Sequence, residues 1–172
     1  MLIYKSRVFD LHSTNVSSRR APFEYLGHAG SCAALLIYEN EESSEVGLLA
    51  HHRPAIGHTL FELPSSVLKN EITIEDVMKD ELRDALGMQV ATRQLNRLTA
   101  LYSSPGYSSE LVTIFLVLLT QVQRLSADSL RWFPLLELNS LIATQEIIDM
   151  KTVAAITAYQ AILWKGQDDE VL

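Results

Sequence analysis

Short apolar runs alternate with polar stretches through the middle of the chain, and this pattern predicts strands. The runs cover residues 32–38, 46–51, 60–63, 96–102 and 112–120. The linker between the first two runs is polar, which is typical of a β-hairpin. The last run is almost continuous in Val, Ile, Phe and Leu, as expected of a strand that is covered on both faces.

Two stretches have the apolar spacing of helices. In residues 74–86 the apolar side chains recur mostly at steps of three and four, so one face of the helix is expected to be buried. Thr73 precedes the first turn as a good N-cap, and Gly87 follows the last turn as a fitting C-terminal stop. A second helix is predicted over about 151–164, within a C-terminal region that is helical in pattern.

The order of these elements predicts one domain of the α/β (α+β) class. A chain of 172 residues that are 48% hydrophobic can form one well-buried core but is short for two ordinary domains. We assign residues 28–172 to this domain. Residues 1–27 hold a strand-like stretch, Leu2–Phe9, followed by a polar passage, and we expect them to form an N-terminal strand extension.

Composition narrows the classes of partner. The net charge is −7, so binding of nucleic acid through general phosphate neutralisation is disfavoured. The single cysteine, Cys32, cannot form an internal disulfide, and its apolar neighbours predict burial. The longest apolar run, 111–119, is far shorter than a bilayer-spanning helix. We therefore expect a cytoplasmic protein with no nucleic-acid or membrane partner.

Residues 62–87 carry the most specific motif. They begin with Glu-Leu-Pro-Ser-Ser and end with Glu-Leu-Arg-Asp-Ala-Leu-Gly. This segment resembles the Nudix box, which reads Gly, five residues, Glu, seven residues, Arg-Glu-apolar, one residue, Glu-Glu, one residue, Gly and an apolar residue. The resemblance implies the Nudix fold, in which a mixed β-sheet is sandwiched between helices. It also implies a loop–helix–loop that holds Mg²⁺ or Mn²⁺ against a pyrophosphate.

Several positions of the box are changed. The chain keeps Glu81 and has Asp84 at the first of the paired glutamates. Ala85 stands at the second, which in the family supplies a principal metal ligand. The other replacements are Ser66 for the first glycine, Ile72 for the first glutamate and Asp80 for the arginine.

The resemblance assigns metal binding to Glu81, Asp84 and the backbone carbonyl of Ser65, and it assigns catalysis to Glu81. Glu71, Asp80 and Asp128 are acids that could compensate for the lost ones. In the alternative interpretation, the acids of this helix are only a solvated face and bind no metal.

Segments outside the box resemble the ADP-ribose pyrophosphatase branch of the Nudix family. His51-His52-Arg53-Pro54, followed by Glu62-Leu63-Pro64-Ser65-Ser66, resembles the strand Gln-Tyr-Arg-Pro followed by Glu-Leu-Pro-Ala-Gly. Residues 104–110 resemble a Ser-Pro-Gly-aromatic-Ser-Asp-Glu loop. The resemblance implies substrate contacts for Arg53 and Glu62 and an assisting catalytic role for Glu110. Residues 146–152 resemble the start of the last helix in that branch, for which we expect packing and no chemistry.

The N-terminal residues carry a further prediction. In the resembled branch, N-terminal strands help to build a homodimer in which each subunit lends residues to the partner's substrate cleft. Leu2–Phe9 fits such a strand, and a short strand is marginal unless it pairs or packs. Arg20 and Glu24 fall near the stretch that, in the resembled branch, extends into the partner's substrate cleft. The resemblance therefore implies substrate contacts for both residues.

Two functional hypotheses follow. In the first, the protein is a divergent metal-dependent pyrophosphohydrolase of a nucleoside diphosphate derivative, such as ADP-ribose or a nucleotide sugar, with weak or altered activity. In the second, it is a catalytically inactive Nudix-fold homodimer with a nucleotide-binding or structural role. The missing carboxylate at Ala85 argues against efficient hydrolysis, because removal of a main metal ligand typically lowers the rate on the order of a thousand-fold.

Overall fold

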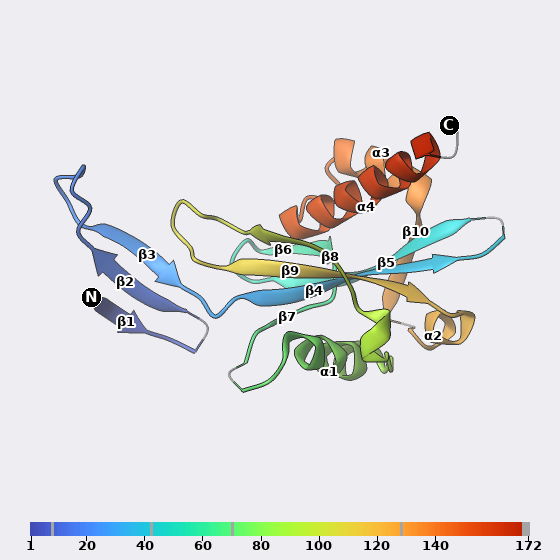
Figure 1. Cartoon of the computed structure of the whole chain (residues 1–172), viewed down its shortest axis with the longest axis horizontal. Coiled ribbons are helices and arrows are strands. Elements are labelled where there is room, and N and C mark those ends of the chain that lie inside the picture. Colours follow the sequence, from blue (N-terminus) through green and yellow to red (C-terminus); the bar gives the residue numbers. More distant parts are fainter. Residues whose placement is uncertain (8, 42, 70, 128, 170–172) are drawn as a thin grey trace.

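The main body of the protein is a mixed β-sheet with helices on both faces (Figure 1). The computed structural model describes residues 1–7, 9–41, 43–69, 71–127 and 129–169. Within these ranges the main sheet has seven strands, and its path runs β10-β5-β4-β9-β8. Two further strands pair beside this path, β6 with β5 and β7 with β4. The predicted mixed α/β architecture is confirmed.

The strands of the main sheet are β4 (Ser31–Glu39), β5 (Ser44–Arg53), β6 (His58–Glu62), β7 (Ser65–Val67), β8 (Asn96–Tyr102), β9 (Leu111–Leu119) and β10 (Leu130–Pro134). The helices are α1 (Ile74–Leu86), α2 (Gln121–Ser126), α3 (Leu138–Ala143) and α4 (Met150–Asp169), with short 3₁₀ turns at Thr92–Gln94 and Leu135–Glu137. No helix in the described ranges is long and apolar enough to cross a membrane.

The centre of the sheet is a parallel pair. β4 lies parallel to β9 in a register that runs from Ser31 opposite Val112 to Tyr38 opposite Leu119. The other pairings in this sheet are antiparallel, including the predicted β4–β5 hairpin. Both central strands are buried over most of their length, as expected for strands covered on both faces.

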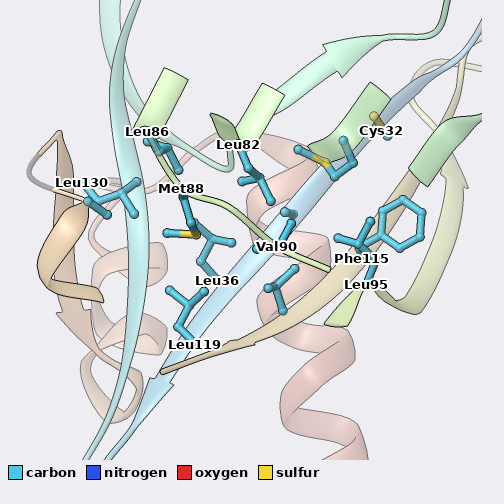
Figure 2. Packing of buried hydrophobic residues seen from close by; sticks show 14 of the residues in the cluster. Cys32, Leu36, Leu82, Leu86, Met88, Val90, Leu95, Phe115, Leu119 and Leu130 are labelled. Carbon is cyan, nitrogen blue, oxygen red and sulfur yellow. The ribbon is translucent and has the colours of Figure 1, made fainter. Parts of the chain in front are cut away.

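Helix α1 covers one face of the sheet. Its buried side chains Val77, Met78 and Leu82 pack with Leu36 of β4 and Phe115 of β9 in one apolar cluster. Figure 2 shows this cluster from close by, with side chains of the helix meeting those of the strands. Cys32 belongs to the same cluster and is fully buried, so the predicted burial of the only cysteine is confirmed.

Helix α4 covers the opposite face. Ala155 and Ile156 of the helix pack with Leu35 and Ile37 of β4 and Ile114 of β9. Alternate residues of β4 therefore serve the two cores, because successive side chains of a strand point to opposite faces. The N-terminal turn of α4 lies beside the ends of β4 and β6 that form the cleft described below.

The residues that bound α1 act as predicted from sequence. The backbone N–H of Asp76 donates to the side chain of Thr73, which caps the first turn. Gly87 ends the helix in the left-handed region with a φ of 63°, and its N–H donates to the carbonyl of Arg83. These caps satisfy backbone groups that a helix end leaves without intrahelical partners.

The N-terminal residues form a separate antiparallel sheet of three strands, β1 (Leu2–Lys5), β2 (Asp10–Thr14) and β3 (Phe23–Gly27). The predicted strand Leu2–Phe9 is shorter than expected, because the chain turns where Ser6 bonds to Phe9 and then returns as β2. The polar passage that follows contains β2, and β3 begins at its end. Both strands are largely half-exposed, so no apolar run marked them.

Candidate active-site cleft

A cleft of about 770 Å³ opens at the end of the main sheet beside the N-terminus of α4. One wall is the face of the β5–β6 hairpin that carries His51, Arg53, Leu60 and Glu62. The other walls come from the start of β4, β7, the ends of β8 and β9, and the first turn of α4. This volume is in the range of clefts that bind nucleotide-sized ligands.

Most of the cleft surface is apolar, and its charged groups lie in two places. The apolar side chains are Ala55, Ile56, Leu60, Val67, Leu101, Val112, Ile114, Met150 and Ala154. The charged groups are Arg53, Glu62, Asp149 and Lys151 at one place and Glu110 at the other. A ligand with one apolar or aromatic part and one polar part matches this division.

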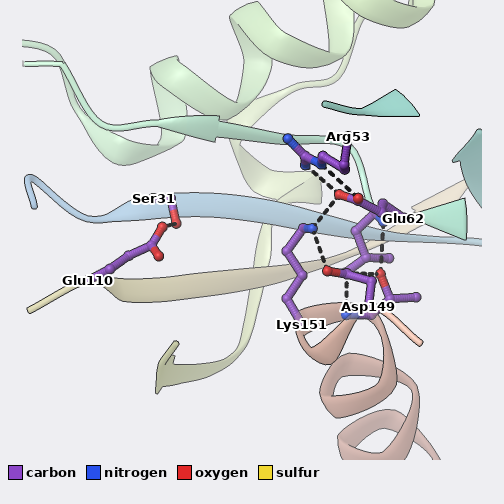
Figure 3. A network of polar contacts seen from close by, with 8 residues as sticks. Ser31, Arg53, Glu62, Glu110, Asp149 and Lys151 are labelled. Carbon is purple, nitrogen blue, oxygen red and sulfur yellow. Dashed lines mark hydrogen bonds and ion pairs between the residues drawn. The ribbon is translucent and has the colours of Figure 1, made fainter. Parts of the chain in front are cut away.

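Glu62 is the centre of the first polar group. Its side chain is only 2% exposed and it accepts two hydrogen bonds from Arg53, of which the one from Nε is 2.8 Å long. The ammonium group of Lys151 donates to the same carboxylate at 2.6 Å. Figure 3 shows Arg53 and Lys151 converging on Glu62 from different elements.

These two cations control the ionisation of Glu62. Burial by itself raises the pKa of a carboxyl, but the hydrogen bonds and charges of Arg53 and Lys151 outweigh it and lower the pKa of Glu62 to about 2. The carboxylate is therefore ionised at any neutral pH. The same hydrogen bonds raise the pKa of Arg53 above its ordinary value.

Asp149 connects this group to α4. One of its oxygens accepts a bond of 3.0 Å from Lys151, and the other accepts the backbone N–H of Thr152 at 3.0 Å. The hydroxyl of Thr152 also donates to Asp149 and accepts the backbone N–H of Leu63 at 3.0 Å. The first turn of α4 is thereby tied to the residue that follows Glu62.

Glu110 forms the second polar place. Its carboxylate accepts a hydrogen bond of 2.8 Å from the hydroxyl of Ser31. His28 Nδ1 lies 3.9 Å from the same carboxylate, but it accepts the backbone N–H of Gly30 at 3.0 Å. A nitrogen that accepts a hydrogen bond carries no proton, so this contact is not an ion pair.

The loop that carries Glu110 is joined to the N-terminal sheet. Leu26 of β3 donates its N–H to Tyr107 at 2.7 Å and accepts the N–H of Ser109 at 3.0 Å. The hydroxyl of Ser109 also accepts the N–H of His28 at 2.9 Å. The N-terminal sheet therefore borders one side of the cleft. Arg20, between β2 and β3, and Glu24 of β3 are exposed and do not line the cleft of the same chain.

The acids of α1 lie outside the cleft wall. Arg83 pairs with Asp80 at 2.8 Å and with Asp84 at 3.0 Å, so both carboxylates have a cationic partner within their own helix. Burial, with a smaller contribution from the charge of Glu81, raises the pKa of the Cys32 thiol to about 11. Helix α1, which carries Glu81, packs against β4 and β7, and Cys32 of β4 is paired with Ser66 of β7.

The structure offers few side-chain ligands for a divalent cation among the described residues. Among the described residues, no group of three or more His, Cys, Asp or Glu side chains is arranged to hold a metal ion. Ala85 is exposed and supplies no ligand, and Asp84 is engaged by Arg83. Glu71 has a left-handed φ of 68° in the loop before α1, and Asp128 lies outside the described residues. The metal ligands named from the sequence stay predictions.

The structure brings some of the predicted residues together and adds others. Arg53, Glu62, Ser65 and Glu110 line one cleft although up to 57 positions separate them in the chain. Sequence reasoning missed several polar residues of the cleft, among them His28, Ser31, Asp149 and Lys151. Asp149 and Lys151 lie in the motif 146–152, so this motif serves the cleft as well as packing. Ser31 and His28 carried no signal in the sequence.

Comparisons with known proteins agree with the motifs. No protein-family model matches the chain. A curated ADP-ribose pyrophosphatase of Bacillus subtilis (strain 168) is similar to it, at 24% identity over 168 residues that cover 92% of this chain and 88% of the relative. This distant similarity extends over nearly the whole length of both chains.

Proposed function

We propose that the protein binds a nucleoside diphosphate derivative, such as ADP-ribose or a nucleotide sugar, in this cleft and hydrolyses it weakly. The observation that carries the proposal is the convergence of Arg53, Glu62, Ser65 and Glu110 on one cleft of suitable size. These residues come from separate segments that each resemble the same family. The similarity to an ADP-ribose pyrophosphatase supports the same class of ligand.

The side chains of the cleft suit the parts of such a ligand. Arg53 is 39% exposed, and a guanidinium binds phosphate oxygens through its planar set of N–H donors. The apolar walls can pack against a base and exclude water from the diphosphate. Glu110 lies in the wall and can accept a proton or a hydrogen bond from water or a ligand hydroxyl.

Catalysis in this proposal needs Mg²⁺ or Mn²⁺. Such an ion, held by Glu81, Asp84 and the carbonyl of Ser65, would polarise the diphosphate and lower the pKa of bound water. The chain offers few ligands for it, because Ala85 carries no carboxylate and Arg83 competes for Asp84. We therefore expect hydrolysis to be slow and to require millimolar metal.

A second candidate function is ligand binding without hydrolysis. The ion pairs of Arg83 with Asp80 and Asp84 favour it, because they turn a face that would hold metal into a neutralised helix surface. In this case the cleft would retain its ligand and release it unchanged.

The decisive experiment measures metal-dependent formation of monophosphate products from ADP-ribose and nucleotide sugars. The proteins compared are the wild type, Glu81→Ala, Ala85→Glu and the control Ala161→Glu, which adds an acid to an exposed position of α4. We expect weak wild-type activity that Glu81→Ala abolishes. Ala85→Glu should raise the rate by on the order of a hundred- to a thousandfold, and the control should not.

The outcomes separate the two candidate functions. No product from the wild type, together with a gain in Ala85→Glu, would establish the inactive binding protein and reject the enzyme. Wild-type activity that survives Glu81→Ala would reject the assignment of α1 as the metal-binding helix.

The proposal includes a homodimer built through the N-terminal sheet. Leu2, Ile3 and Tyr4 on β1 are about half-exposed, which is costly for apolar side chains on a small sheet. In such a dimer Arg20 and Glu24 would reach the partner's cleft. The direct contacts of Leu26 with Tyr107 and Ser109 support this geometry, because they hold the N-terminal sheet at the edge of the cleft.

A further inference from the structure

The start of α4 is built around the cleft and not only around the core. Met150, Lys151 and Ala154 of its first two turns line the cleft wall, and Asp149 immediately precedes the helix. Asp149 accepts the N–H of Thr152, which is the position of an N-cap bond. The partial positive charge of the helix N-terminus offsets part of the charge of Asp149.

Two cations share the single carboxylate of Glu62. Arg53 uses Nε and Nη2 for it, and its third guanidinium nitrogen points away from Glu62 (Figure 3). Lys151 approaches the same carboxylate from α4, and its own side chain is only 16% exposed. Glu62 thus has one negative charge and two positive neighbours. Asp149 also pairs with Lys151, so the cluster of Arg53, Lys151, Glu62 and Asp149 has two positive and two negative charges.

We propose that Lys151 is a positioning residue that leaves part of the charge of Arg53 available to an anionic ligand. Because Lys151 shares the carboxylate of Glu62 with Arg53, the guanidinium keeps an attraction for a second anion at its outward-facing nitrogen. Asp149 and Thr152 hold Lys151 at this place through the first turn of α4. The role deepens the proposed function, since it rests on the cleft taking a ligand that carries a diphosphate.

Loss of Lys151 would change this balance in a defined direction. With a neutral side chain at position 151, Glu62 would pair with Arg53 alone, and the local charge would fall by one. Arg53 would be held more firmly on Glu62 and would attract an anion less. A residue that only supports packing would have the opposite effect on Arg53, because loosening the first turn of α4 would expose the guanidinium.

The first measurement is the Kd of ADP-ribose in EDTA, where the ligand is not turned over. We expect Lys151→Met to weaken binding by about five- to tenfold and Lys151→Arg, which keeps the charge, to stay within about twofold of the wild type. The matched control is Lys79→Met, which removes a lysine from an ion pair with Asp76 on the opposite side of the sheet.

The second measurement needs no ligand. Phenylglyoxal modifies arginine side chains, and peptide mass spectrometry gives its rate at Arg53. We expect Arg53 to react several-fold more slowly in Lys151→Met than in the wild type, and Lys151→Arg to restore the rate. Faster modification in Lys151→Met, or an unchanged rate, would overturn the positioning role.

The two measurements separate the two ideas. A wild type that does not bind ADP-ribose would reject the proposed function, while the rate at Arg53 would still decide the role of Lys151. A wild type that binds ADP-ribose equally well with and without Lys151 would reject the positioning role and leave the proposed function standing.

Discussion

Glu62 shows how one side chain can serve both stability and the cleft. A carboxylate that is almost fully buried is costly unless charged partners compensate for its lost hydration. Here Arg53 from β5 and Lys151 from α4 provide that compensation, so the same contacts join three elements. Glu62 therefore connects three elements and also orients two cationic side chains in the cleft.

The ionisation of Glu62 leads to a prediction about pH. Its pKa is about 2 in the folded protein against an ordinary value of 4.5, so the unfolded chain takes up a proton at higher pH than the folded one. The stabilisation is present above pH 4.5 and is lost as the pH falls towards 2. We expect Glu62→Gln to lower the free energy of unfolding by about 2 kcal/mol at pH 7 and by much less at pH 3.

Urea unfolding followed by circular dichroism at pH 7, 5, 4 and 3 would measure this difference. Arg124→Gln, which breaks the less buried pair with Glu45, is a suitable comparison, because its cost should be smaller. A cost of Glu62→Gln that does not shrink with falling pH would contradict the assigned pKa.

At the scale of elements, α1 is the part of the chain most completely determined by local sequence. Its start at Thr73, its stop at Gly87 and its apolar face all follow from residue types and spacing, and the structure has the predicted bounds of 74–86. Caps and amphipathic spacing act within a few residues of each other, so no tertiary contact is needed to specify them.

The stop at Gly87 gives a prediction with a close control. A Cβ at Gly87 would meet nothing within 4 Å, so only its φ of 63° opposes a side chain. We expect Gly87→Ala to lower the free energy of unfolding by about 1 kcal/mol. Gly106→Ala also meets nothing within 4 Å and has no such backbone requirement, so it should be near neutral.

Thermal or chemical unfolding of the two variants side by side would test this explanation. Equal costs for the two substitutions would show that the left-handed conformation at Gly87 is not what selects glycine there.

Other elements could not be predicted because their stabilisation is not local. β2 and β3 have mixed, half-exposed side chains, and they form strands because antiparallel neighbours satisfy their backbone groups. The short helix α2 depends on a cap at Thr120 and on Gln123, whose side chain also bonds to the backbone of Gln89, 34 positions earlier. A window of local sequence around α2 contains Thr120 but not Gln89.

At the scale of the whole molecule, the N-terminal sheet lies to one side of the main sheet (Figure 1) and is joined to it by a bridge between Leu26 and Ser108. The two backbone bonds of Leu26 make this junction beside Ser108. The N-terminal sheet exposes the apolar side chains of Leu2, Ile3 and Tyr4, and subunit interfaces commonly bury side chains of this kind. Assembly and the state of the cleft are expected to be linked through this junction.

The predicted dimer can be tested with one substitution and its control. Light scattering should find the wild type as a dimer at micromolar concentration, and Ile3→Asp should shift it towards the monomer, because a charge on β1 opposes burial of this strand. Leu136→Asp changes an apolar side chain that is 94% exposed on the main body and should have no effect. A wild-type monomer, or equal effects of both variants, would argue against assembly through the N-terminal sheet.

The sequence by itself determined the fold class, the helix α1, the β4–β5 hairpin and the family resemblance, because periodicity, caps and motif spacing are local properties. It also named Arg53, Glu62, Ser65 and Glu110 as members of one site. Only the tertiary structure decided which charged partners these side chains have. It paired Arg83 with Asp84, gave Glu62 two cations and placed Lys151 in the cleft. Such contacts join residues up to 89 positions apart, and their energies depend on burial and distance that exist only after folding.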